Sequence, residues 1–107
     1  MAKKILSKTD LSRNAIVLNE ELARVFHQRG VFPSLGGDNL FVVAVKIYFK
    51  NTGEELLASY YASLRNEDRP IEERMWANAF GKAAVAGDEL TIEFDGKRFV
   101  AEVRPAP

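Results

Sequence analysis

The feature that most constrains the fold is a run, at residues 40–50, in which large apolar residues recur at every second position. This period places them on one face of a β-strand, as expected for a strand buried on one side. The face comprises Phe41, Val43, Val45, Ile47 and Phe49. Asn51-Thr52-Gly53 follows directly and predicts a hairpin, after which residues 54–63 return as a second strand. Such a chain folds around paired neighbouring strands rather than as a helix bundle.

A second hairpin is predicted near the C-terminus, where Asp95-Gly96 separates the strand-like residues 89–94 and 97–103. Shorter strands are predicted at residues 3–6 and 15–18, and residues 71–75 fit either a strand or a helical turn. The predicted strands therefore number seven. Because most of them follow one another directly, we expect a single, open, mostly antiparallel sheet that curls on itself.

Two short helices complete the predicted fold. The first spans residues 20–29, with Asn19 as its N-cap. The second spans residues 76–82, where Trp76 and Phe80 share one face and are expected in the core. The intervening polar or glycine-rich stretches at residues 7–14, 31–39 and 64–70 are interpreted as loops. The predicted fold class is mainly β with two short helices.

Composition narrows the possible functions. The 107 residues suit one domain, predicted at 1–104 with a short tail at 105–107. Cysteine is absent and His27 is the only histidine, which excludes disulfides and sites built from several histidines or thiolates. We predict no metal and no cofactor. No apolar run approaches the roughly 20 residues of a membrane span, and no secretory signal is evident, so we expect no membrane contact and a cytoplasmic location.

Catalysis is not favoured by the pattern of titratable residues. Acidic residues occur as adjacent pairs in predicted loops, caps and turns, which is typical of a solvated surface. Glu93 and Glu102 on the last hairpin are the loose candidates for a metal-dependent nuclease or other hydrolase. His27 lies near the end of the first predicted helix, where a structural role is favoured. We therefore predict no catalytic residues and no enzyme, with a hydrolase as the minor alternative.

Two polar stretches suit contacts with nucleic acid. Residues 1–14 carry a net charge of +3, because four cations stand against one acid, although the whole chain has a net charge of zero. Residues 64–74 carry a net charge of −1, from three arginines against four acids. Arginine and asparagine suit base edges, whereas lysine and serine suit phosphates. These stretches therefore predict either a DNA interface or two solvated loops.

The order of motifs resembles the DNA-binding pseudobarrel group. This group includes the plant B-three-type transcription-factor domain and the effector DNA-binding domains of some bacterial restriction endonucleases. Three stretches carry the resemblance: Leu6-Ser7-Lys8-Thr9-Asp10-Leu11 followed by Ala15-Ile16-Val17-Leu18 and a helix, Trp76-Ala77-Asn78-Ala79-Phe80, and Val85-Ala86-Gly87-Asp88-Glu89-Leu90. The fold implied by the resemblance is a seven-stranded pseudobarrel.

The resemblance also implies two arms that grip the major groove, one after the first strand and one between the fourth and fifth strands. The predicted interface comprises Lys3, Lys4, Lys8, Ser12, Arg13 and Asn14 in or beside the first arm, and Arg65, Asn66, Arg69 and Arg74 in the second. Arg13, Asn14, Arg65 and Asn66 would read bases, and Lys3, Lys4 and Lys8 would contact phosphate.

The predicted function is sequence-specific binding of double-stranded DNA. The implied roles are transcription regulation or restriction-modification, the latter with a fused or associated catalytic domain as partner. An acidic fifth strand departs from the pattern expected beside phosphate. The alternative is a small protein-interaction module that uses an exposed strand edge or the acidic pairs and has no nucleic-acid role.

Overall fold

The structure is a computed structural model that describes residues 2–12, 15–35, 43–63, 72–76 and 84–105. In chain order the elements are β1 (Ala2–Ile5), α1 (Lys8–Ser12), β2 (Ala15–Val17), α2 (Glu20–His27), β3 (Ser34–Leu35), β4 (Val43–Phe49), β5 (Glu54–Ser63), β6 (Glu72–Trp76), β7 (Glu89–Phe94) and β8 (Phe99–Arg104). No helix in these ranges is long and apolar enough to cross a membrane.

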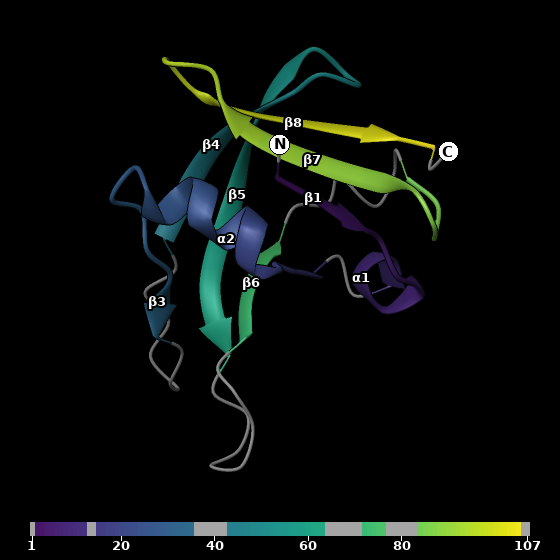
Figure 1. Ribbon diagram of the computed structural model, residues 1–107, viewed down its shortest axis with the longest axis horizontal. Helices are drawn as coiled ribbons and strands as arrows, with labels where there is room; N and C mark the ends of the chain where they lie inside the picture. Colours follow the sequence, from purple (N-terminus) through teal and green to yellow (C-terminus); the bar gives the residue numbers. More distant parts are fainter. Residues whose placement is uncertain (1, 13–14, 36–42, 64–71, 77–83, 106–107) are drawn as a thin grey trace.

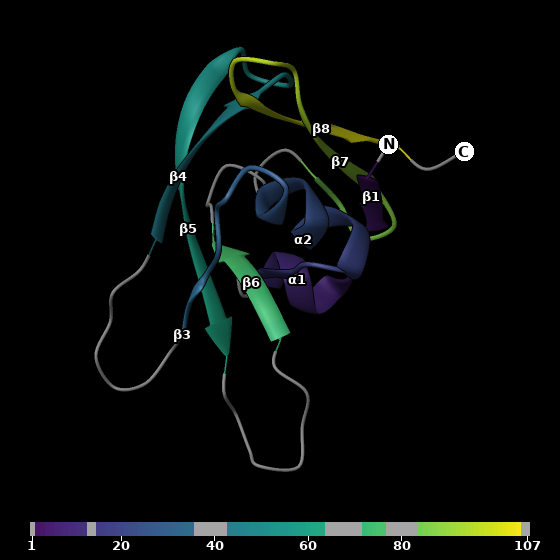
Figure 2. The same cartoon turned by 60° about the vertical axis from the view of Figure 1, so that its left-hand side comes forward.

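All the strands belong to one curled sheet. The main path runs β1-β7-β8-β4-β5-β6-β2, and the two-residue β3 pairs with β5 beside it. Pairing within the described ranges is antiparallel except between β4 and β8 and between β3 and β5. The sheet wraps around α2, which lies in its concave side (Figures 1 and 2). The predicted seven-stranded, mostly antiparallel sheet is confirmed, with β3 as an addition that the sequence had suggested was loop.

The core fills the space between α2 and the concave face of the sheet. On β4, Val45, Ile47 and Phe49 are buried while Lys46 is exposed, as the alternation predicts. On α2, the fully buried ring of Phe26 meets the sheet. Asn19 caps this helix as predicted, since its side-chain oxygen accepts a hydrogen bond from the Leu22 N–H at 2.9 Å.

Residues 8–12 form the short helix α1, where the sequence had suggested a loop. Ser7 and Asp10 explain the difference, because they form a reciprocal cap. The Asp10 N–H donates to Ser7 Oγ at 3.1 Å, and the Ser7 N–H donates to Asp10 Oδ2 at 2.9 Å. This satisfies two backbone donors at the helix start, as in a capping box. Ser7 and Asp10, which suggested a turn, thus cap the start of a helix.

Trp76 also departs from the prediction of a buried helical residue. It is the last residue of β6, pairs with Ala15 of β2, and is 46% exposed. Strand pairing therefore determines its conformation, and residues 72–75, for which the sequence allowed either a strand or a helical turn, form a strand. The remainder of the predicted second helix, including Phe80, lies outside the described residues.

The C-terminal hairpin forms with a longer turn than predicted. Phe94 pairs with Phe99, so β8 begins at Phe99 and the turn spans residues 95–98. The Asp95 carboxylate accepts hydrogen bonds from the backbone N–H groups of Lys97 and Arg98, both at 2.9 Å. Gly96 has a φ of 102°, a left-handed conformation that favours glycine. An aspartate that binds two donors stabilises this wider turn.

Candidate nucleic-acid interface

The β2–β6 pair fixes where the two predicted arms attach. Ala15 pairs with Trp76, so the first arm, at residues 7–14, enters β2 beside the end of β6. The second arm is predicted at about residues 65–74, and β6 begins within it at Glu72. Four steps along β6 separate these positions, a distance of about 13 Å at roughly 3.3 Å for each residue. The two arms are therefore attached near opposite ends of β6, the first through β2 and the second directly.

Half of the predicted interface residues fall within the described part of the chain. They are Lys3, Lys4, Lys8, Ser12 and Arg74. The residues predicted to read bases, together with one more arginine, lie outside it and stay predictions: Arg13, Asn14, Arg65, Asn66 and Arg69. The structure consequently describes residues 7–12 of the first arm and, of the second, the part that lies in β6.

A buried carboxylate holds the first arm against the sheet. Asp10 is 2% exposed, and it accepts hydrogen bonds from the Ser7 N–H at 2.9 Å and the Val17 N–H at 3.1 Å. The Lys4 ammonium lies 3.1 Å from this carboxylate and also donates to the Val17 carbonyl oxygen. One aspartate thus joins α1 to both β1 and β2.

The hydrogen bonds outweigh burial in setting the acidity of Asp10. Burial by itself would raise the pKa of this carboxyl group, because it disfavours the charged form. The backbone N–H groups of Ser7 and Val17 and the ammonium of Lys4 stabilise the carboxylate, so its pKa falls below the ordinary value of 3.8. Asp10 is therefore ionised at neutral pH and forms a charge-assisted anchor.

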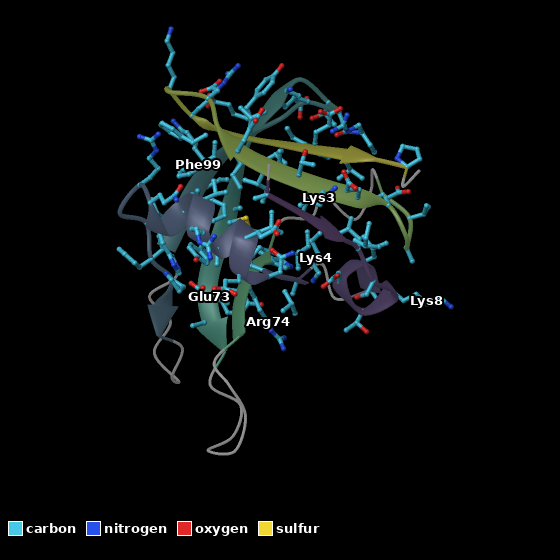
Figure 3. All side chains as sticks on the ribbon, viewed as in Figure 1. Lys3, Lys4, Lys8, Glu73, Arg74 and Phe99 are labelled. Carbon is cyan, nitrogen blue, oxygen red and sulfur yellow. The ribbon has the colours of Figure 1, made fainter. Side chains whose placement is uncertain are left out.

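The other predicted residues of the arms differ in exposure. Lys3 and Lys8 are exposed, and Lys8 extends from α1 away from the body of the molecule (Figure 3). Ser12 is exposed at the end of α1, where its hydroxyl donates to the Thr9 carbonyl at 3.3 Å. Arg74 is 9% exposed on β6, directly opposite Val17 of β2. The side chains of Lys3, Lys8 and Ser12 are thus open to solvent, whereas Lys4 is partly buried and Arg74 is buried.

The sequence analysis did not predict a cluster of polar side chains that connects β6 to α2 and β5. Glu73 Oε1 is 2.7 Å from His27 Nε2 on α2, and it accepts a hydrogen bond from the Tyr60 hydroxyl at 2.6 Å. Glu73 is one of the acidic residues that the sequence placed on a solvated surface, yet its side chain is only 20% exposed. The partners are 46 and 13 residues away along the chain, so no local spacing could have indicated the cluster.

The chemistry of this cluster is structural. Burial, followed by the hydrogen bond to the Glu73 carboxylate, raises the pKa of Tyr60 far above its ordinary value. The phenol therefore remains protonated at neutral pH and donates its hydrogen bond to the Glu73 carboxylate. Among the described residues, no three metal-ligating acids or histidines lie together. The cluster ties α2 to β5 and β6, which carry the second arm.

Replacing Tyr60 with phenylalanine tests this interpretation. The change deletes one hydroxyl and keeps the buried ring, so we expect the free energy of unfolding to fall by about 1 kcal/mol. Chemical denaturation of the two proteins measures the difference. A loss below the error of the measurement would show that the hydrogen bond to Glu73 contributes nothing to holding β6.

Comparison with known proteins supports the fold. No protein-family model matches the sequence, and no curated protein matches it significantly. Among solved structures, one described as an Arabidopsis FUS3–DNA complex aligns with a TM-score of 0.71 at 14% identity, over 98% of this chain and 96% of that chain. The predicted fold class is confirmed, and so is the resemblance in fold to the plant B-three-type domain.

Proposed function

We propose that this protein binds double-stranded DNA by placing its two arms in the major groove. The observation that carries the proposal is the attachment of the arms at opposite ends of β6. The first arm enters β2 at Ala15, beside Trp76, and the second enters β6 at Glu72, about 13 Å away at roughly 3.3 Å per residue. The major groove of B-DNA is about 12 Å wide, so two segments with this separation suit its two walls. Likeness to a chain solved in a DNA complex supports the same function.

The predicted residues take different roles in this proposal. The exposed Lys3 and Lys8 contact phosphates, as long flexible cations do in most DNA complexes. Arg13 and Asn14 in the first arm, and Arg65 and Asn66 in the second, read base edges, and Arg69 belongs to the same second arm. Lys4 takes a different role from the phosphate contact that its sequence position suggested. Its ammonium is bound to Asp10, so Lys4 positions the arm.

Zero net charge sets a limit on the affinity of the isolated chain. Non-specific attraction to phosphate depends on an excess of cations, which this chain has only locally. Base contacts must then supply much of the binding free energy, which is consistent with a sequence-specific reader. Such a reader would act in transcription regulation, or in restriction-modification beside a fused or associated catalytic domain. No step of the proposed binding needs a metal, a cofactor or an enzymatic reaction.

Alanine substitution in each arm tests the proposal. We expect Arg13→Ala and Arg65→Ala each to weaken binding to a preferred duplex by about 1–3 kcal/mol, because each removes a bidentate base contact. Fluorescence anisotropy with a duplex selected from a random pool gives the affinities. Repeating the titration at higher salt should weaken binding steeply, because bound phosphates release counterions.

Lys50→Ala is the matched control for these variants. Lys50 is an exposed cation in the β4–β5 turn, at the end of β5 opposite the second arm. Its loss should leave the affinity unchanged. If Lys50→Ala weakens binding as much as the arm variants, or if only one arm variant has an effect, the two-arm interface is wrong.

A further inference from the structure

An open groove lies away from the two arms, along the first half of β4. Its volume is about 690 Å³, and its walls are the chain at residues 30–32 and the β7–β8 turn. Four consecutive residues of β4, Val43 to Lys46, line it. Consecutive side chains of a strand point to opposite faces of the sheet. A groove that all four residues line therefore runs along the edge of the strand, where backbone groups lie.

The backbone of β4 is open toward this groove. β8 pairs with β4 only at Ile47–Phe49, and the next residue, Lys50, donates its N–H to the Ala101 carbonyl of β8 at 2.9 Å. Hydrogen-bonding direction alternates along a strand, so the N–H and C=O groups of Ala44 and Lys46 face the same side. In the described part of the chain these groups have no backbone partner. Within the described residues they form an open strand edge.

The charge around this edge is positive. Lys46, Lys97 and Arg98 line the groove, and Glu55 is the one acidic residue in its described lining. Arg98 lies 3.8 Å from Glu55 and stacks over the Tyr48 ring at 3.9 Å. Neither lysine has an ion-pair partner among the described residues. The cationic excess is therefore available to an acidic ligand.

Aromatic side chains provide the apolar part of the groove. Phe32 is 58% exposed and stacks on His27, with ring centroids 5.0 Å apart. Phe94 lies on the other wall, and the guanidinium of Arg29 sits 4.1 Å from its ring centroid. The groove thus combines a free strand edge, cations and aromatic surface.

We propose that this groove binds an extended, acidic peptide segment of a partner protein, which adds to the sheet as a strand along Ala44 and Lys46. Strand addition uses main-chain hydrogen bonds for affinity and flanking side chains for selectivity. Alternate acidic side chains would meet Lys46 and Lys97, and an apolar side chain would meet Phe32. A second copy of this chain fits poorly, because edge-to-edge pairing would bring like charges together at Lys46.

The probe for this site is a fluorescein-labelled eight-residue peptide of alternating glutamate and valine. We expect this peptide to bind the intact chain. We expect Lys46→Glu to weaken binding by about tenfold or more, because the substitution removes a hydrogen bond to a charged group. Ala44→Pro removes one N–H donor on the open edge and should also weaken binding. Lys50→Glu is the control, because Lys50 is an exposed lysine in the turn that follows β4, and it should leave binding unchanged.

Peptide variants keep the test decisive even if Ala44→Pro fails to fold. A peptide with N-methyl groups on alternate residues lacks the donors for strand addition, and a lysine–valine peptide reverses the charge, so we expect both to bind far more weakly. Equal binding of either variant peptide, or equal loss from Lys46→Glu and Lys50→Glu, would overturn the proposal. Sedimentation of the free chain as a dimer that Lys46→Glu alters would also overturn it in favour of self-association.

Discussion

Replacing Phe26 with alanine is expected to lower the free energy of unfolding by about 4 kcal/mol, near the upper range for a truncation in a core. Phe26 is fully buried on α2. Its ring centroid lies 5.1 Å from that of Tyr60 on β5 and 4.8 Å from that of Phe99 on β8. The truncation therefore leaves a cavity where the helix meets both sides of the curled sheet, and aromatic contacts are lost as well.

Denaturant unfolding followed by circular dichroism measures this loss. Phe32→Ala is the matched control, since the same atoms are removed from a side chain that is 58% exposed. We expect that control to cost less than about 1 kcal/mol. Similar losses for the two variants would contradict the assignment of Phe26 to the centre of the core.

Asp10→Ala is expected to cost about 3 kcal/mol, the second largest effect among these variants. The cost arises because the substitution leaves buried polar groups without a partner. The Lys4 ammonium would remain partly buried without its carboxylate, and the N–H groups of Ser7 and Val17 would lose their acceptor. Removing one partner of a buried ion pair costs more than the pair itself contributes.

The matched control is Glu20→Ala, which also removes one member of an ion pair. The Glu20 side chain is 89% exposed and pairs with Arg24 one helical turn away. Such a pair contributes at most about 0.5 kcal/mol. If the two acidic residues proved equally dispensable, Asp10 would not be the anchor of the first arm.

Acid should remove the contribution of Asp10. Its pKa is lower in the folded protein than the ordinary value of 3.8, so this stabilisation is complete above that value and is lost as pH falls through the folded pKa. The difference in unfolding free energy between the native chain and Asp10→Asn should therefore stay level near neutral pH and shrink once the pH falls below about 4. A difference that stays constant as the pH falls would show that the charge of Asp10 does not stabilise the fold.

The fold could be predicted from the sequence wherever the signal is local. The alternation that ends in Ile47 and Phe49 and the turn at residues 51–53 suffice for the central hairpin, because period and turn chemistry act between neighbours. Short segments were less predictable. The polar residues of α1 form a helix because Ser7 and Asp10 cap each other, and Trp76 is in a strand because β2 pairs with it.

The support of the candidate interface depends on contacts that no sequence spacing encodes. Asp10 acts through Lys4 and Val17, and Glu73 acts through Tyr60 and His27. In the sequence pattern, Asp10 and Glu73 look like ordinary surface acids. Only folding brings hydrogen-bond donors around their carboxylates. The residues of the arms were predicted from composition and resemblance, and those that would read bases stay predictions.

The most direct test of the proposed function is a nuclear magnetic resonance titration of the isotopically labelled chain with its preferred DNA duplex. The backbone amide signals report which residues meet the ligand. We expect the shifts to concentrate at residues 8–14 and 64–74 and beside Lys3, with little change at Ala44, Lys46 and Lys97. Shifts concentrated along the β4 groove, or spread over both faces without the arms, would contradict binding through the two arms.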